Sequence, residues 1–210
     1  TPSYHIALRQ MRGHKRGTNS MKQLLIILLL VPLLAFSKTQ DPSVLVIDRA
    51  TNKTIVNRNE NQQRPIASIT KLMTALVALE HTPDLYAEYK MSRSQSTKIP
   101  TNKATLKDLL TIMLVQSDNG AAETIAENFP GGRDAFIQQM NYKAYMMGLK
   151  NTKFIDPSGL GMNVSTASEV STLITTALNN PFIKTTASIR KTKIEQQKGK
   201  RTKTIILHNT

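Results

Sequence analysis

Cysteine and tryptophan are absent from the 210 residues, and aromatic residues make up only 5% of them. Without cysteine the chain forms no disulfide, offers no thiolate nucleophile and binds no metal through sulfur. Its four histidines, none spaced as HxxxH or HxH, are His5, His14, His81 and His208. We therefore expect neither a metal nor another cofactor. Because base stacking needs aromatic side chains, we also expect no nucleic-acid partner.

Acidic residues are scarce relative to basic ones, with 14 Asp and Glu against 28 Lys and Arg. Residues 1–37 hold five of the basic residues and none of the acidic ones, so the rest of the chain carries a net charge of +9. Such a charge favours anionic surfaces. It predicts, at most, peripheral association with a membrane or a cell wall. The 40% apolar content is enough for the packed core of one domain.

One long apolar run lies near the N-terminus. Residues 24–34 read LLIILLLVPLL, with Lys22 before them and the small residues Ala35 and Ser37 after them. This order is typical of a secretory signal peptide, and the run is shorter than the roughly 20 residues of a membrane-spanning helix. The alternative, a buried core helix, is disfavoured by Pro32 inside the run.

The chain is expected to divide at this run. Residues 21–37 are predicted to be the signal peptide. Residues 1–20 are expected to be an upstream segment or a long n-region, since Met21 or Met11 is the more plausible start than Thr1. Residues 38–210 are expected to form the folded, exported domain.

Strand patterns flank a central block of helix patterns, which predicts a mixed α/β (α+β) class. The expected strands are 43–48, 54–57, 187–194 and 203–208, and the first two form a hairpin around Thr51 and Asn52. The expected helices are 68–81, 105–116, 121–128, 134–148 and 166–178. The second and fifth begin with Thr followed three residues later by Asp or Glu, a capping-box spacing.

Ser68 and Lys71 are the first candidates for chemistry. Residues at i and i+3 of a helix share one face, so a hydroxyl and an amine at this spacing can exchange a proton, provided that burial lowers the lysine pKa. About one SxxK is expected by chance in a chain of this length, and Ser188 to Lys191 is a second. Only Ser68 begins an apolar helix, so Ser188 is interpreted as ordinary surface.

Ser117-Asp118-Asn119 is the second candidate motif. It follows the helix pattern LKDLLTIMLVQ, precedes Gly-Ala-Ala, and contains the only Ser-x-Asn of the chain. Its hydroxyl can relay a proton and its carboxamide can bind a substrate amide. Ser, Asp and Asn are also ordinary turn and cap residues, so the motif gains its weight from its place after Ser68 and Lys71.

With both motifs in this order, the chain resembles the low-molecular-mass penicillin-binding proteins, which are D-alanyl-D-alanine carboxypeptidases and endopeptidases. The resemblance rests on RPIASITKLMTA (64–75), SDNGAA (117–122) and FIDPSGL (154–160). It implies the serine β-lactamase-like DD-peptidase fold, an antiparallel sheet flanked by helices with a helical subdomain. It also implies a periplasmic location, peptidoglycan stem peptides as substrates and β-lactam antibiotics as covalent inhibitors.

The same resemblance assigns roles to four residues. Ser68 would be the nucleophile that forms an acyl-enzyme, and Lys71 would be its general base. Ser117 would pass a proton to the leaving amine, and Asn119 would bind the substrate amide. The Ser-Asp-Asn form and the FIDPSGL segment favour the endopeptidase branch over the carboxypeptidase branch.

The third motif of this family, Lys-Thr-Gly, is absent. The Lys-Thr pairs at 184, 191 and 203 are followed by Thr, Lys and Ile. We therefore expect a chain truncated before the C-terminal sheet strands, and no turnover by these 210 residues alone, because that strand would supply an oxyanion-hole donor.

Two other functions use features of the same sequence. A class A β-lactamase shares both motifs but needs a glutamate to activate the deacylating water. The region after the second motif where that glutamate is expected contains only Glu123, Glu127 and Glu169, and all lie in expected helices. A non-catalytic wall-binding module would use the positive charge and keep the motifs as relics.

Overall fold

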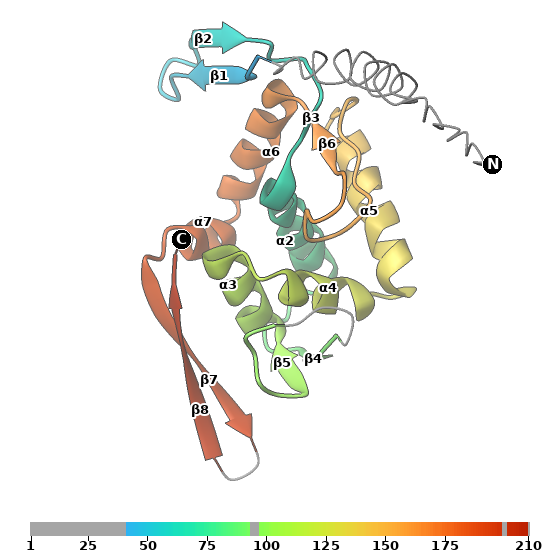
Figure 1. Ribbon diagram of the computed structural model, residues 1–210, viewed down its shortest axis with the longest axis vertical. Helices are drawn as coiled ribbons and strands as arrows, with labels where there is room; N and C mark the ends of the chain where they lie inside the picture. The colour runs from blue at the N-terminus through green and yellow to red at the C-terminus, as the bar shows by residue number, and fades with distance from the viewer. Residues whose placement is uncertain (1–40, 93–96, 199–200, 210) are drawn as a thin grey trace, which may run out of the picture. The chain divides into compact units, whose positions relative to one another are not determined.

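The computed structural model describes residues 41–92, 97–198 and 201–209 (Figure 1). The strands are β1 (Val44–Ile47), β2 (Thr54–Arg58), β3 (Arg64–Pro65), β4 (Glu88–Lys90), β5 (Lys103–Thr105), β6 (Val164–Ser165), β7 (Lys191–Lys198) and β8 (Arg201–His208). The helices are the 3-10 turn η1 (Ala67–Ile69), α2 (Thr70–His81), α3 (Leu106–Gln116), α4 (Asn119–Glu127), α5 (Gly132–Met146), α6 (Ala167–Asn179) and α7 (Pro181–Ala187). The expected signal peptide and the segment before it lie outside these ranges.

Helix α2 lies at the centre of the helical part, in contact with α3, α4, α5 and α6 (Figure 1). Its side chains are buried nearly all round, as its sequence predicts. The largest fully buried side chains that surround it include Leu109 and Met113 of α3, Ile125 of α4 and Phe136 of α5. Within the part of the chain that the structure describes, no helix is long and apolar enough to cross a membrane.

Side-chain caps fix where the helices around α2 begin. Thr105 caps α3 by accepting a hydrogen bond from the backbone N–H of Asp108, and Thr166 caps α6 in the same way from Glu169. Both caps follow the predicted capping-box spacing, so the predicted starts of these helices are confirmed. Gly148 ends the α5 region with a φ of 75°, the left-handed conformation that a C′ glycine adopts.

The described strands form four separate antiparallel pairs: β1 with β2, β3 with β6, β4 with β5 and β7 with β8. The mixed class and the β1–β2 hairpin are confirmed, but the pairs β3–β6 and β4–β5 join segments too short to show a period in the sequence. The expected strand over 187–194 is wrong at its start, because α7 reaches Ala187. Asn180 caps α7 and Pro181 occupies its first turn, a start that suits proline because its missing N–H has no partner there in any helix.

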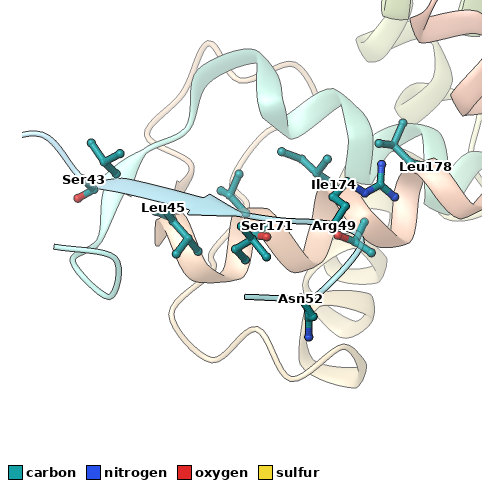
Figure 2. Close-up of a pocket in the computed structure, with 12 residues that line it drawn as sticks. Ser43, Leu45, Arg49, Asn52, Ser171, Ile174 and Leu178 are labelled. Carbon is teal, nitrogen blue, oxygen red and sulfur yellow. The ribbon is translucent and has the colours of Figure 1, made fainter. Parts of the chain in front are cut away.

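A cavity of about 580 Å³ lies between β1 and α6 (Figure 2). Leu45 comes from the strand side, and Ile174 and Leu178 come from the helix side. Arg49 is the only charged residue among those that line it. The cavity therefore lacks the paired ionisable groups of a catalytic site.

Candidate active site

Ser68 sits on η1, immediately before α2. The chain reaches it through β3, which pairs with β6, and the backbone N–H of Ile66 donates to the Asn163 carbonyl at 3.1 Å. Ala67 then takes a φ of 44°, a left-handed conformation that is rare for alanine. This turn leaves Ser68 exposed at the N-terminal end of a buried helix, where a nucleophile must be reached by substrate.

Lys71 lies in the first turn of α2 and is only 3% exposed. Its Nζ atom donates to Ser68 Oγ at 3.2 Å, to Asn119 Oδ1 at 2.7 Å and to the Ser158 carbonyl at 2.5 Å. The i, i+3 spacing therefore places the amine against the serine, as the sequence predicts. All three N–H bonds of the ammonium form have an acceptor.

Ser117 and Asn119 project from the junction of α3 and α4. Ser117 ends α3 with φ 55° and ψ 34°, and Asp118 caps α4 by accepting from the Ala121 N–H. The Ser117 hydroxyl donates to Ser68 Oγ at 2.9 Å. The structure thus brings all four predicted residues together, across 48 or 49 residues of chain between the two motifs.

Burial lowers the pKa of Lys71 from 10.5 to about 8. Two carboxylates, Asp156 and Asp118, act in the opposite direction and keep that pKa from falling further. A lysine in this range is partly neutral near pH 7–8. It can therefore accept a proton from a serine hydroxyl to which it is already hydrogen-bonded.

The loop from 154 to 161, whose FIDPSGL segment is part of the family resemblance, also reaches the site. It supplies the Ser158 carbonyl that accepts from Lys71. Gly159 has a φ of 88°, and a Cβ atom there would lie 2.0 Å from the Ala67 carbonyl oxygen. Sequence reasoning missed this contact because a backbone carbonyl has no residue signature. The buried Asp156 in FIDPSGL was the available signal.

Asp156 organises that loop. Burial would raise the pKa of its carboxyl group, but hydrogen bonds from Ser158, Gly159 and Gly161 together hold the pKa below its ordinary value. The group is therefore a carboxylate at neutral pH. Its charge adds to the field around Lys71.

The alternative candidates have other partners. Ser188 ends α7 at the surface and donates its hydroxyl to the Lys184 carbonyl, which agrees with its interpretation as ordinary surface. Glu123 pairs with Arg133 at 2.8 Å, and Glu169 accepts from Asn151 and Thr152. Among the described contacts, neither of these two glutamates is hydrogen-bonded to Ser68 or Lys71.

A cavity of about 330 Å³ opens over three of the four predicted site residues. Ser68, Lys71 and Ser117 line its polar side, and Leu72 and Leu114 contribute to its apolar side. It is smaller than the cavity beside β1. Of these two cavities, the smaller one contains the predicted nucleophile Ser68 and the buried amine of Lys71.

Residues 35–210 match the protein family described as D-alanyl-D-alanine carboxypeptidase. The chain belongs to this family. It is 38% identical over 150 residues to the D-alanyl-D-alanine endopeptidases of Pseudomonas aeruginosa and Escherichia coli, an overlap that covers 67% of this chain and 48% of each relative. It is 34% identical over 188 residues to the D-alanyl-D-alanine endopeptidase of Haemophilus influenzae, covering 85% of this chain and 63% of the relative.

Two solved structures share the fold. The Streptomyces K15 DD-transpeptidase superposes with a TM-score of 0.72 at 22% identity, covering 81% of this chain and 76% of that one. A D-alanyl-D-alanine carboxypeptidase from Mycobacterium tuberculosis gives a TM-score of 0.67 at 26% identity, covering 80% and 69%. The serine DD-peptidase fold is confirmed. The chain spans about half the length of the first two curated relatives.

Proposed function

We propose that the protein is a serine D-Ala-D-Ala peptidase that acts on peptidoglycan stem peptides through an acyl-enzyme on Ser68. One observation carries the proposal: Ser68 Oγ lies within hydrogen-bonding distance of both the Lys71 amine and the Ser117 hydroxyl. A serine flanked by a buried base and a second hydroxyl has both of the proton partners that acyl transfer requires.

The reaction begins with Lys71 in its neutral form. Its lone pair accepts the Ser68 proton while Ser68 Oγ attacks the carbonyl carbon of the D-Ala peptide bond. As the C–N bond breaks, the Ser117 hydroxyl gives a proton to the leaving nitrogen and regains one from the Lys71 ammonium. Water then attacks the ester, and the acid product leaves with Ser68 restored as a hydroxyl.

Asn119 is the substrate-binding residue in this mechanism. Its Oδ1 atom accepts from Lys71, which directs the Nδ2 end of the amide away from the lysine. Nδ2–H is a donor suited to a peptide carbonyl of the substrate. The apolar side of the cavity, with Leu72 and Leu114, suits the methyl groups of D-alanine.

Labelling by a fluorescent penicillin tests the nucleophile. The protein expressed from its complete reading frame is expected to label covalently, because the β-lactam amide is opened by the same attack. Ser68→Ala is expected to abolish labelling. Ser188→Ala, the matched serine of the second SxxK, is expected to label like the parent. Labelling that survives Ser68→Ala would refute the assignment, and a parent that never labels would favour the wall-binding module.

We favour the endopeptidase activity over the carboxypeptidase activity because the relatives with 34–38% identity over at least 150 residues carry that name. Digestion of purified peptidoglycan separates the two. An endopeptidase converts cross-linked dimers into monomers, whereas a carboxypeptidase releases free D-alanine from pentapeptides. Rapid nitrocefin hydrolysis would instead indicate a β-lactamase.

Export to the periplasm and peripheral contact with the wall or membrane are part of the proposal. They rest on the apolar run at 24–34 and on the positive charge. Fractionation of cells that express the protein, with and without residues 21–37, tests the location. We also retain the prediction that these 210 residues alone do not turn over substrate, since they contain no Lys-Thr-Gly.

A further inference from the structure

Asp156 is a buried carboxylate next to the site to which the mechanism above assigns no step. Its side chain is on a residue only 6% exposed. Oδ1 accepts from the backbone N–H groups of Ser158 and Gly159 at 2.7 and 2.6 Å and from the Ser158 hydroxyl at 2.8 Å. Oδ2 accepts from the Gly161 N–H at 2.8 Å. The loop thus folds around a single carboxylate, which accepts four hydrogen bonds from three of its residues.

The wrapped loop is fastened to α2. Thr74 Oγ1 donates to the Pro157 carbonyl at 2.6 Å. Asn163 donates from Nδ2 to Thr70 Oγ1 at 2.9 Å and accepts at Oδ1 from the Ile155 N–H at 2.7 Å. The loop is therefore held on the same helix that carries Lys71. A shift of the Asp156 carboxylate would move the loop relative to that helix.

The Ser158 carbonyl decides where the lone pair of Lys71 points. A protonated lysine has three N–H donors, and a neutral one has two donors and one lone pair. Ser158 O and Asn119 Oδ1 are pure acceptors, so they take the two remaining N–H bonds of the neutral amine. The lone pair then faces the third partner, the Ser68 hydroxyl.

We propose that Asp156 is a positioning residue: its carboxylate holds the Ser158 carbonyl where that carbonyl directs the Lys71 lone pair at Ser68. The inference rests on the proposed function, since it concerns the proton transfer from Ser68 to Lys71. Misplacement of a catalytic group by about 1 Å costs roughly 100-fold in rate. An equivalent loss is expected when the carboxylate is removed.

Asp156 also affects the charge of Lys71, and the two effects can be separated. The charged groups nearby are Asp156 on the loop, Asp118 before α4, and the pair of Glu123 and Arg133 on α4 and α5. Removal of the Asp156 charge lowers the pKa of Lys71, which leaves more neutral base at pH 7. If Asp156 acted only through its charge, its removal would not reduce the fraction of neutral Lys71 and would not slow acylation in this way. If it positions the loop, its removal slows acylation at every pH.

The test compares Asp156→Asn with the parent and with Asp84→Asn, which removes the same charge from an exposed loop. The acylation rate by fluorescent penicillin is measured at pH 7 and at about pH 10, where Lys71 is neutral in every variant. We expect Asp156→Asn to be about 10- to 100-fold slower at the higher pH. Its Lys71 midpoint, followed by carbon-13 NMR of the lysine ε-carbon, is expected to fall below that of the parent, and Asp84→Asn is expected to match the parent in both.

Equal rates for the parent and a folded Asp156→Asn at the higher pH overturn the inference. Should that variant not fold, as judged by circular dichroism, Ser158→Ala decides. It keeps the carbonyl but removes one of the four donors to Asp156, and a loss of about 3-fold or more supports the inference. An unchanged rate for Ser158→Ala then overturns it. A parent that is never acylated refutes the proposed function itself, together with this role. This outcome is distinguishable from the others, because in both of them the parent is acylated and only the rate of the variant is in question.

Discussion

Gly159 is the position where the structure allows no side chain. A Cβ atom there would lie 2.0 Å from the Ala67 carbonyl oxygen, 2.3 Å from its carbon and 2.9 Å from the Ser68 nitrogen. All three are backbone atoms, so no side-chain rotation relieves the overlap. The φ of 88° adds a penalty of roughly 1–2 kcal/mol for any L-residue with a side chain. Overpacking adds roughly 1–3 kcal/mol more. We expect Gly159→Ala to lower the free energy of unfolding by about 2–5 kcal/mol.

Gly148→Ala is the matched control, because Gly148 has a φ of 75° but nothing within 4 Å of the position of an added Cβ. An alanine at 148 therefore has the cost of a positive φ but no steric overlap with neighbouring atoms. Urea unfolding of both variants should therefore show Gly159→Ala as less stable by about 1–3 kcal/mol. The same overlap displaces the 67–68 peptide, so labelling by fluorescent penicillin should fall for Gly159→Ala alone. Equal stability of the two variants would refute the close approach of the loop to the nucleophile.

Three further predictions concern single residues. Because the pKa of Lys71 is about 8 when folded and 10.5 when unfolded, the folded state binds fewer protons between these values. The free energy of unfolding of the parent should therefore rise by up to about 3 kcal/mol from pH 8 to 10.5 relative to Lys71→Met, and parallel pH curves would contradict this. Thr166→Ala removes the cap of α6 and should cost about 1 kcal/mol in thermal unfolding, whereas Thr176→Ala, at a half-buried site in the interior of the same helix that caps nothing, should cost less. Ser117→Gly should have a free energy of unfolding about 0.5–1 kcal/mol higher than Ser117→Ala, because glycine tolerates the left-handed conformation, and it should lose penicillin labelling. Equal stability of these two variants would contradict that reasoning.

Most of the helices could be predicted from residues close together in the sequence. The caps at Thr105 and Thr166 depend only on residues three positions away, so the sequence shows them directly. The same holds for Ser68 and Lys71, whose contact follows from one turn of helix. Contact between the two motifs was expected from the family resemblance, and the structure confirms it at 2.9 Å between Ser117 and Ser68.

Features that depend on distant residues were not predictable from local patterns. The β3–β6 pair joins segments of two residues each that lie about a hundred positions apart, too short for any period to appear. The predicted strand start at Ala187 was wrong, because this residue belongs to α7, a seven-residue helix that packs against α3 and α6. The Ser158 carbonyl is a main-chain group, and any residue type would supply it. Its role becomes visible only when the loop is seen folded around Asp156.

Strained backbone conformations and a buried ionisable group occur together at the candidate site for a physical reason. Four non-glycine residues in the described chain have a positive φ, and two of them, Asn52 and Asn59, are of a type that tolerates it. The other two are Ala67, directly before the proposed nucleophile Ser68, and Ser117, whose hydroxyl donates a hydrogen bond to Ser68. Glycine would relieve both, but at 117 it would remove the hydroxyl that the proposed proton transfer uses. The buried Lys71 follows the same logic, since its lowered pKa destabilises the fold at neutral pH and makes the amine a base. Strain and a destabilised charge persist where the surrounding packing holds them and where function needs them.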